Sequence, residues 1–215
     1  MDAHTSLPLF PLNVVIFPES RLPLHIYEER YRTMVTDAIA NGTEFGINLL
    51  EKNHLHPVGC SVSVVSVVRR YPDGSFDIIV EGMKRYRLLE YHGTTVGYLQ
   101  GSIEELYDTA DMPDEAQQTK AVALYNAILS IGFPQQQPDL FAGLTQTATM
   151  SFRMAEKAGL DLPAKQRLLE LVSERQRIDY LVEHMETAIP VLREQDQLQK
   201  LIINDGYLPA FRPEL

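Results

Sequence analysis

The single cysteine is the first candidate for covalent chemistry in this chain. Cys60 lies in VGCSVSVVSVV, where valines alternate with small residues in a pattern typical of a buried β-strand. A reactive thiol needs accessible, electropositive surroundings that lower its pKa. Because a buried strand offers neither, we predict that Cys60 is an inert core side chain. One cysteine also excludes an intramolecular disulfide.

The histidines are the second candidates, for metal binding or proton transfer. His54 and His56 are two residues apart, so in an extended segment both rings point to one side. Two ligands could start a metal site, but no third ligand is evident nearby in the sequence, and we expect a solvated loop. His25 lies between Leu24 and Ile26, which favours a structural histidine over a catalytic one.

Charged side chains that are close in the sequence are the third group of candidates for a functional site. Glu28 and Glu29 open a predicted helix, where carboxylates complement the helix dipole, and this role is favoured over a catalytic pair. Five basic side chains could gather on neighbouring strands and meet an anion or an acidic partner, the ordinary alternative being a solvated sheet face. These are Arg69, Arg70, Lys84, Arg85 and Arg87.

The common signatures of cofactor chemistry are missing from the sequence. We find no GxxxxGK[ST] loop, no GxGxxG after a strand, no HExxH, no CxxC and no GxSxG. We therefore expect no catalytic residues, no metal and no cofactor.

The composition narrows the classes of molecule that the protein could bind. With 19 Lys and Arg against 29 Asp and Glu, the 215-residue chain has a formal charge of −10, which argues against general nucleic-acid binding. The N-terminus lacks a basic segment followed by an apolar one, and no long apolar run avoids both charge and proline. We expect a cytoplasmic protein with neither nucleic acid nor membrane as a partner.

The first half of the chain is predicted to be mostly β-structure. Alternation slips by one residue after Val64, which predicts a β-bulge near Val64–Val65. One helix over residues 27–42 interrupts the strands, and Gly42 suits its C-terminal cap. The expected strands cover residues 44–52, 58–71, 75–82, 84–91 and 94–107.

The second half is predicted to be helical, over residues 119–132, 140–159 and 164–204. Pro163 suits the start of the last helix, and Pro190 should kink or split it. These patterns predict an α+β protein: a β pseudo-barrel with one inserted helix over residues 5–110, then an α-helical domain over residues 111–215.

The run LPLFPLNVVIFPESRLPL at residues 7–24 is apolar yet carries four prolines, namely Pro8, Pro11, Pro18 and Pro23. A proline inside a helix destabilises it by about 3 kcal/mol. In a central strand, proline has no amide hydrogen to donate to the neighbouring strand. We expect short extended pieces separated by a bend, with Pro23 on an edge strand.

Three stretches resemble one family. LPLFPLNVVIFPESRLPLHIYEERYRTMV is similar to the opening of the Lon protease N-terminal, substrate-binding domain. VGCSVSVVSVVRRYPDGSFDIIVEGMKRYRL resembles its paired strands around a PDG turn and ends in an EGxxR pattern, here Glu81, Gly82 and Arg85. LPAKQRLLELVSERQRIDYLVEHM is similar to the helical part. The resemblance spans residues 7 to about 190 and implies a PUA-like pseudo-barrel followed by a helical bundle.

The resemblance implies a non-catalytic module that binds unfolded or tagged polypeptides, as an adaptor in protein quality control alongside a protease or chaperone. The ATPase and serine–lysine protease domains of the full family are not in this sequence, so we expect no proteolysis by that mechanism. Candidate contacts with an extended polypeptide are Ile16, Phe17, Tyr27 and Tyr31.

Two other functions stay open. One is an enzyme or ligand-binding protein that acts on a small molecule between the barrel and the helical part, since barrels of this kind can host ligands. The other is RNA binding, which the charge of −10 opposes. The oligomeric state is not predicted, because the long periodic helix could self-associate.

Overall fold

The computed structural model describes residues 5–132 and 149–204, with side chains as far as residue 196. The chain divides into two compact units. The first consists of Met1–Asp111 and Leu160–Glu174, and the second of Met112–Gly159 and Arg175–Leu215. The polypeptide therefore leaves the first unit, returns to it for one helix, and leaves again.

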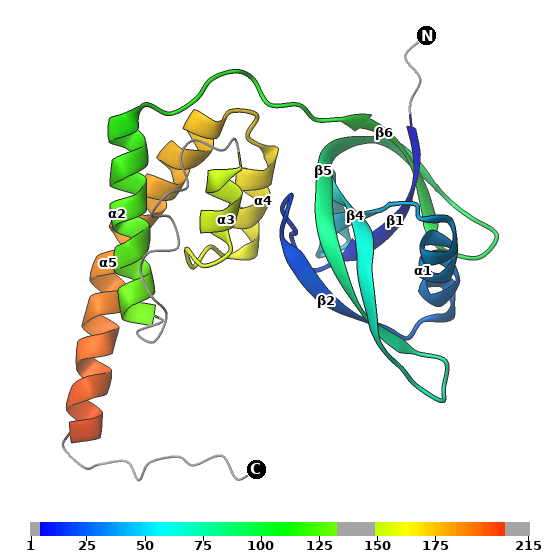
Figure 1. The fold of residues 1–215 in the computed structure, drawn as a ribbon, viewed down its shortest axis with the longest axis horizontal. Coiled ribbons are helices and arrows are strands. Elements are labelled where there is room, and N and C mark those ends of the chain that lie inside the picture. The colour runs from blue at the N-terminus through cyan, green and yellow to red at the C-terminus, as the bar shows by residue number, and fades with distance from the viewer. Residues whose placement is uncertain (1–4, 133–148, 205–215) are drawn as a thin grey trace. The chain divides into compact units, whose positions relative to one another are not determined.

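Six strands of the first unit form one sheet that closes on itself (Figure 1). In the ring, β1 pairs with β3 and β6, and β4 and β5 complete the circuit, because β5 also pairs with β6. The β1–β3 pair is parallel and the other pairs are antiparallel. The predicted α+β near-barrel is thus confirmed. The strands are β1 Thr5–Leu12, β2 Arg21–Ile26, β3 Phe45–Glu51, β4 His54–Arg70, β5 Phe76–Gly93 and β6 Leu99–Glu105.

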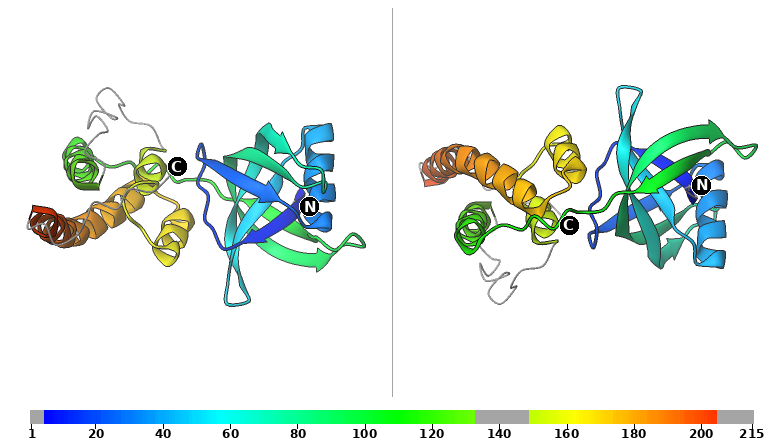
Figure 2. Two further views of the ribbon diagram at one scale, coloured as in Figure 1. Left: turned by 90° about the horizontal axis from the view of Figure 1, so that it is seen from below. Right: turned by 90° about the horizontal axis from the view of Figure 1, so that it is seen from above.

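The predicted helix between the strands is α1, Glu29–Asn41, which Figure 2 shows lying against the ring of strands. Its apolar side packs into the main core of the first unit, where Met34 and Val35 are almost fully buried. Gly42 ends the helix in the left-handed conformation, with φ of 63°, as expected of a C-terminal glycine.

The predicted bulge lies in β4, and a second one follows it. Between Val64 and Ser66 the ladder advances two residues on β4 and one on β5, so that Val65 is the extra residue. The same shift between Val67 and Arg69 makes Val68 an extra residue. Both valines are exposed, at 45% and 61%. We call Val65 and Val68 the bulge valines below.

The β5 strand corrects one expectation. Residues 84–91 are not a separate strand, because β5 runs without a break from Phe76 to Gly93. A further register shift near Gly82 lets this one strand pair with β2 and β4 over its first half and with β6 over its second.

The proline-rich run has the predicted bend and edge strand, but its first part, β1, is a central strand that pairs with both β3 and β6. Pro8 and Pro11 lie within β1, and Pro18 lies in a turn of the connection to β2. Pro23 lies in β2, which pairs only with β5 and is an edge strand. Proline is tolerated there because an edge strand can leave one side of its backbone unpaired.

The helices of the second half are α2 Glu115–Gly132, α3 Met150–Ala155, α4 Leu162–Glu170 and α5 Glu174–Asn204. Pro163 lies in the first turn of α4, as predicted, and the Asp161 carboxylate accepts a bond from the Ala164 amide. The prediction of one helix over 164–204 is wrong, and so is a split at Pro190; the alternative of a kink there stays a prediction. The break falls at residues 171–173, and α5 continues through Pro190.

Two expectations can be compared with the described residues only in part. Of the helix expected over residues 140–159, the segment 140–148 lies outside the described residues, and α3 lies in the rest. The domain division at residues 5–110 and 111–215 stays a prediction about parts that fold independently. In the described part of the chain, no helix is long and apolar enough to span a membrane.

Candidate functional site

The EGxxR pattern at the middle of β5 organises the first unit, beginning with Gly82. A Cβ at this position would lie 2.0 Å from the backbone oxygen of Phe17. The Gly82 amide donates to the Ser20 oxygen, and the Gly82 oxygen accepts from the Glu19 amide. Glycine therefore lets the proline-rich connection, residues 13–20, lie directly on β5. The neighbouring Glu81 carboxylate pairs with Arg21 at 2.9 Å.

Substitution of Gly82 by alanine should detach this connection. The new methyl group meets backbone rather than a movable side chain, so we expect a loss of about 1–3 kcal/mol in the free energy of unfolding. Thermal unfolding followed by circular dichroism measures it. Gly93→Ala is the control, because nothing lies within 4 Å of a Cβ there. Equal stability of the two variants would contradict the close packing.

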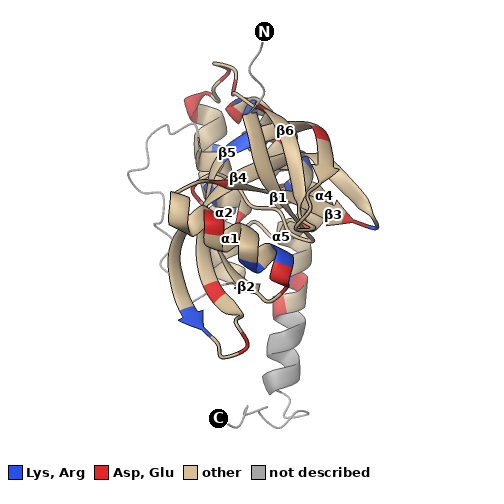
Figure 3. Cartoon of the chain, turned by 90° about the vertical axis from the view of Figure 1, so that its right-hand side faces the viewer, with Lys and Arg blue, Asp and Glu red and all other residues tan. Residues whose placement is uncertain are grey.

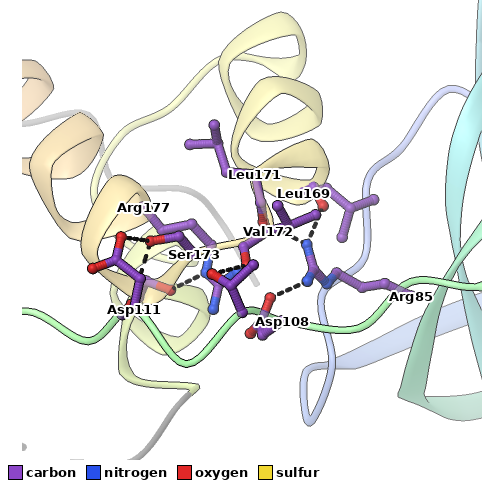
Figure 4. Close-up of polar contacts among 10 residues, drawn as sticks. Arg85, Asp108, Asp111, Leu169, Leu171, Val172, Ser173 and Arg177 are labelled. Carbon is purple, nitrogen blue, oxygen red and sulfur yellow. Dashed lines mark hydrogen bonds and ion pairs between the residues drawn. The ribbon is translucent and has the colours of Figure 1, made fainter.

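Arg85, the last residue of the pattern, is buried, with 4% of its surface exposed. Its guanidinium donates to the backbone oxygens of Leu169 and Leu171, at 2.7 and 2.6 Å, and pairs with the Asp108 carboxylate (Figure 4). The last carbonyls of a helix have no partner within the helix. Arg85 therefore caps the C-terminus of α4 and ties it to the segment after β6.

Residues 108–111 and 171–173 also contact each other directly. The Thr109 amide donates to the Val172 oxygen at 2.8 Å, and the Ser173 hydroxyl donates to the Asp111 carboxylate at 2.7 Å. Both segments appear together in Figure 4. These bonds give the EGxxR pattern a structural role in holding the first unit together.

Three of the four predicted polypeptide contacts are buried. Ile16, Phe17 and Tyr31 are 4%, 2% and 6% exposed, whereas Tyr27 is 65% exposed. Ile16 and Tyr31 belong to the main core, and the ring of Tyr31 stacks on that of Phe10 at 4.0 Å. The four therefore form no common surface in this conformation. Their role in binding stays a prediction.

The thiol is as inert as the sequence predicts. Cys60 is 1% exposed, and its Sγ donates to the Ser61 oxygen at 3.4 Å. Burial raises the pKa of the Cys60 thiol to about 12. Hardly any thiolate therefore forms near neutral pH, so the group is a poor nucleophile.

The histidines do not form a metal site in the part of the chain that is described. His54 and His56 lie at the start of β4 rather than in the expected solvated loop, with their rings 4.8 Å apart, and no group of three or more possible ligands occurs among the described residues. His25 Nδ1 lies 2.6 Å from the Asp77 carboxylate, which also accepts a bond from the Tyr71 hydroxyl. The bonds from Tyr71 and His25 lower the pKa of Asp77. This network agrees with a structural His25.

The five basic residues do not gather. Arg85 is buried against α4, and Lys84 pairs with Glu105 at 3.1 Å. Arg87 lies opposite Val58 in the ladder, whereas Arg70 lies opposite Phe76 at the far end of it. The five residues therefore lie at separate positions along β4 and β5 and form no single patch; they are Arg69, Arg70, Lys84, Arg85 and Arg87.

Several apolar side chains of β4 and β5 are exposed. Besides the bulge valines, Met83, Leu89 and Tyr91 are 42%, 41% and 55% exposed. The sequence signalled the first bulge through the slip in alternation, but it signalled neither the second bulge nor the exposure of Val65 and Val68. Exposed apolar side chains are candidates for contact with a partner.

The free strand edges are less suited to binding an extended polypeptide than these side chains are. Within the described residues, β3 pairs with β4 only as far as Val62, so the rest of β4 has a strand on one side only. Bulges and prolines are the usual devices that discourage further strand pairing. The two bulges of β4 and Pro23 of β2 therefore both act against addition of a strand.

A family model described as the ATP-dependent protease La (LON) substrate-binding domain matches residues 6–187. The chain belongs to this family. The Lon proteases of Chloroherpeton thalassium and Xanthomonas oryzae pv. oryzae are 25% and 26% identical to it, over 93% and 91% of this chain. The chain spans only about a quarter of the length of these Lon proteases.

Solved structures of the Lon N-terminal domain have the same fold. A Lon N-terminal domain protein from Xanthomonas campestris superposes with a TM-score of 0.68 at 24% identity, covering 83% of this chain and 98% of that one. The N-terminal domain of the Mycobacterium avium complex Lon protease gives 0.64 at 15% identity, covering 85% and 98%. The region that matches the Lon family is thus its substrate-binding domain.

Proposed function

We propose that the chain is a non-catalytic polypeptide-binding module that acts as an adaptor in protein quality control. Its partners are unfolded or tagged polypeptides, with a protease or chaperone supplied separately. The observation that carries this proposal is the exposure of the bulge valines on a domain of the Lon substrate-binding family. β-bulges commonly redirect a side chain toward a functional surface.

The proposed mechanism is capture by apolar contact. Burial of a valine side chain is favourable by about 1.5 kcal/mol or more when it is complete. Val65 and Val68 are half exposed, so each gains part of that value on contact with an extended segment. Such contacts do not depend on one particular sequence, which suits a binder of unfolded chains.

The four residues named from the sequence fit this mechanism unequally. Tyr27 can contact a polypeptide directly, because most of its side chain is exposed. Ile16, Phe17 and Tyr31 can do so only if the proline-rich connection or α1 moves away from the core. We therefore place the first contacts at the bulge valines and Tyr27.

Replacing both bulge valines by serine should weaken binding of a permanently unfolded protein about fivefold or more, since two partly exposed apolar contacts are lost. The measurement is fluorescence anisotropy with labelled, reduced and carboxymethylated lactalbumin. Val96→Ser is the matched control, because Val96 is 47% exposed but lies in the loop between β5 and β6. Unchanged affinity in the double variant, or equal loss in the control, would contradict the assignment.

The adaptor role has a separate test. The purified chain, immobilised and exposed to cell lysate, should recover an ATP-dependent protease or a chaperone together with unstable proteins. Recovery should fall in the Val65→Ser/Val68→Ser variant. A protein that binds unfolded lactalbumin but recovers neither a protease nor a chaperone is a binding module without the adaptor role.

A further inference from the structure

A cavity of about 340 Å³ lies on the first unit, between α1 and the turn that joins β4 to β5. Its lining residues include two arginines, Arg32 and Arg70, and two acidic residues, Glu29 and Asp37. Phe76 also lines the cavity but is only 2% exposed. The cavity is separate from the bulge valines, which are not among its lining residues.

Arg32 comes from α1, and its guanidinium is held in place by the turn between β4 and β5. Its Nη1 donates to the Asp73 oxygen at 3.0 Å, and Gly74, with φ of 84°, leaves room for it, since a Cβ there would lie 2.3 Å from Nη1. Its Nε is buried and has no hydrogen-bond partner in the described part of the chain. Arg32 is therefore fixed in position by this turn.

The guanidinium of Arg70 is also fixed, because its central carbon lies 5.3 Å from the centre of the Phe76 ring. Among the residues that the structure describes, neither Arg32 nor Arg70 forms an ion pair. Arg21, Arg30 and Arg85 of the same unit each have a carboxylate partner.

The two carboxylates of the cavity select among anions. Glu29, Arg32 and Asp37 all lie on α1, where Figure 3 shows charges of both signs, and with Arg70 they make the lining formally neutral. A simple anion gains little long-range attraction from a neutral site. A ligand that carries a carboxylate next to hydrogen-bond donors matches both signs.

We propose that this cavity binds the C-terminal end of a polypeptide. The α-carboxylate lies between Arg32 and Arg70, where paired guanidinium donors bind carboxylates well. The main-chain amides that precede it face the carboxylates of Glu29 and Asp37. This inference rests on the proposed function and adds a preference for free chain ends to it.

The test compares three fluorescein-labelled decapeptides of one sequence by anisotropy at low salt. The first ends in a free carboxylate, the second in an amide, and the third in an amide after a penultimate glutamate. The wild-type protein should bind the free acid about tenfold more tightly than either amide. Arg70→Gln and Arg32→Gln should each abolish that difference and leave binding of the plain amide unchanged.

Arg69→Gln is the matched control, because Arg69 precedes Arg70 but lies 4.9 Å from the Tyr71 ring and does not line the cavity. It should keep the tenfold preference. Equal binding of acid and amide by the wild type, equal effects of the Arg69 and Arg70 variants, or tight binding of the glutamate peptide would each overturn the inference. If unfolded lactalbumin still binds, only the chain-end preference fails; if it does not, the proposed function fails too.

Discussion

Substitution of Arg85 by methionine should lower the free energy of unfolding of the first unit by about 3 kcal/mol. Methionine fills much of the same space but cannot donate to the oxygens of Leu169 and Leu171, which Arg85 now satisfies. A buried acceptor that loses its donor carries the full penalty of its desolvation. The ion pair between Arg85 and the Asp108 carboxylate is also lost.

The loss should be greatest at α4. Hydrogen exchange measured by mass spectrometry should show faster exchange in peptides that cover residues 162–173, with a smaller change in α1. Arg87→Met is the matched control, because Arg87 lies two residues along the same strand and is exposed. If Arg85→Met left exchange at α4 unchanged, the capping role of Arg85 would be wrong. Arg85→Lys should lie between, since one ammonium cannot reach all three acceptors as a guanidinium does.

Phe17→Ala should cost about 3–5 kcal/mol in the free energy of unfolding, because it empties a buried site that held a large aromatic ring. The cavity cannot close easily, since the backbone of Phe17 lies against Gly82. Chemical denaturation followed by circular dichroism measures the loss. Val15→Ala, in the same connection but only half buried, should cost clearly less.

The same variant decides between two roles for the proline-rich connection. A side chain that serves only as core should alter stability, while binding of unfolded lactalbumin at a temperature where the variant stays folded should be unchanged. A residue that contacts the bound polypeptide should instead alter binding and leave stability unchanged. Full stability together with lost binding would support the assignment made from the sequence and contradict the one made from burial.

Elements set by local patterns could be predicted from the sequence. The helix that ends at Gly42 and the bulge after Val64 are each encoded within a few residues, by a glycine cap and by a slip in alternation. The order of edge and bend in the proline-rich run follows from the missing amide hydrogen of proline.

The break at residues 171–173 could not be predicted in this way, because distant partners cause it. Val172 and Ser173 bond to Thr109 and Asp111 rather than to the preceding turn of helix. The periodic pattern continues across the break, so the sequence indicates one helix. Pro190 shows the opposite case, in which an unfavourable residue is accommodated within α5.

The candidate site was predicted less well than the fold, for a related reason. An apolar residue such as Ile16 or Val65 can be core or contact, and only its neighbours in space decide which. The cavity beside α1 combines Arg32 and Arg70 from segments far apart in the chain. Arg70 is one of the five basic residues that the sequence offers as anion contacts, but nothing in the sequence around Arg32 indicates that the two share a cavity.

The order in which the first unit is assembled follows from the path of its chain. Arg85 and the barrel strands leave the ribosome well before α4, because Met112–Gly159 must be synthesised in between. Until then the surface that α4 covers is open and the Arg85 guanidinium has no carbonyls to bind. A nascent chain of this protein therefore passes through an incomplete stage that exposes a surface which the finished first unit buries.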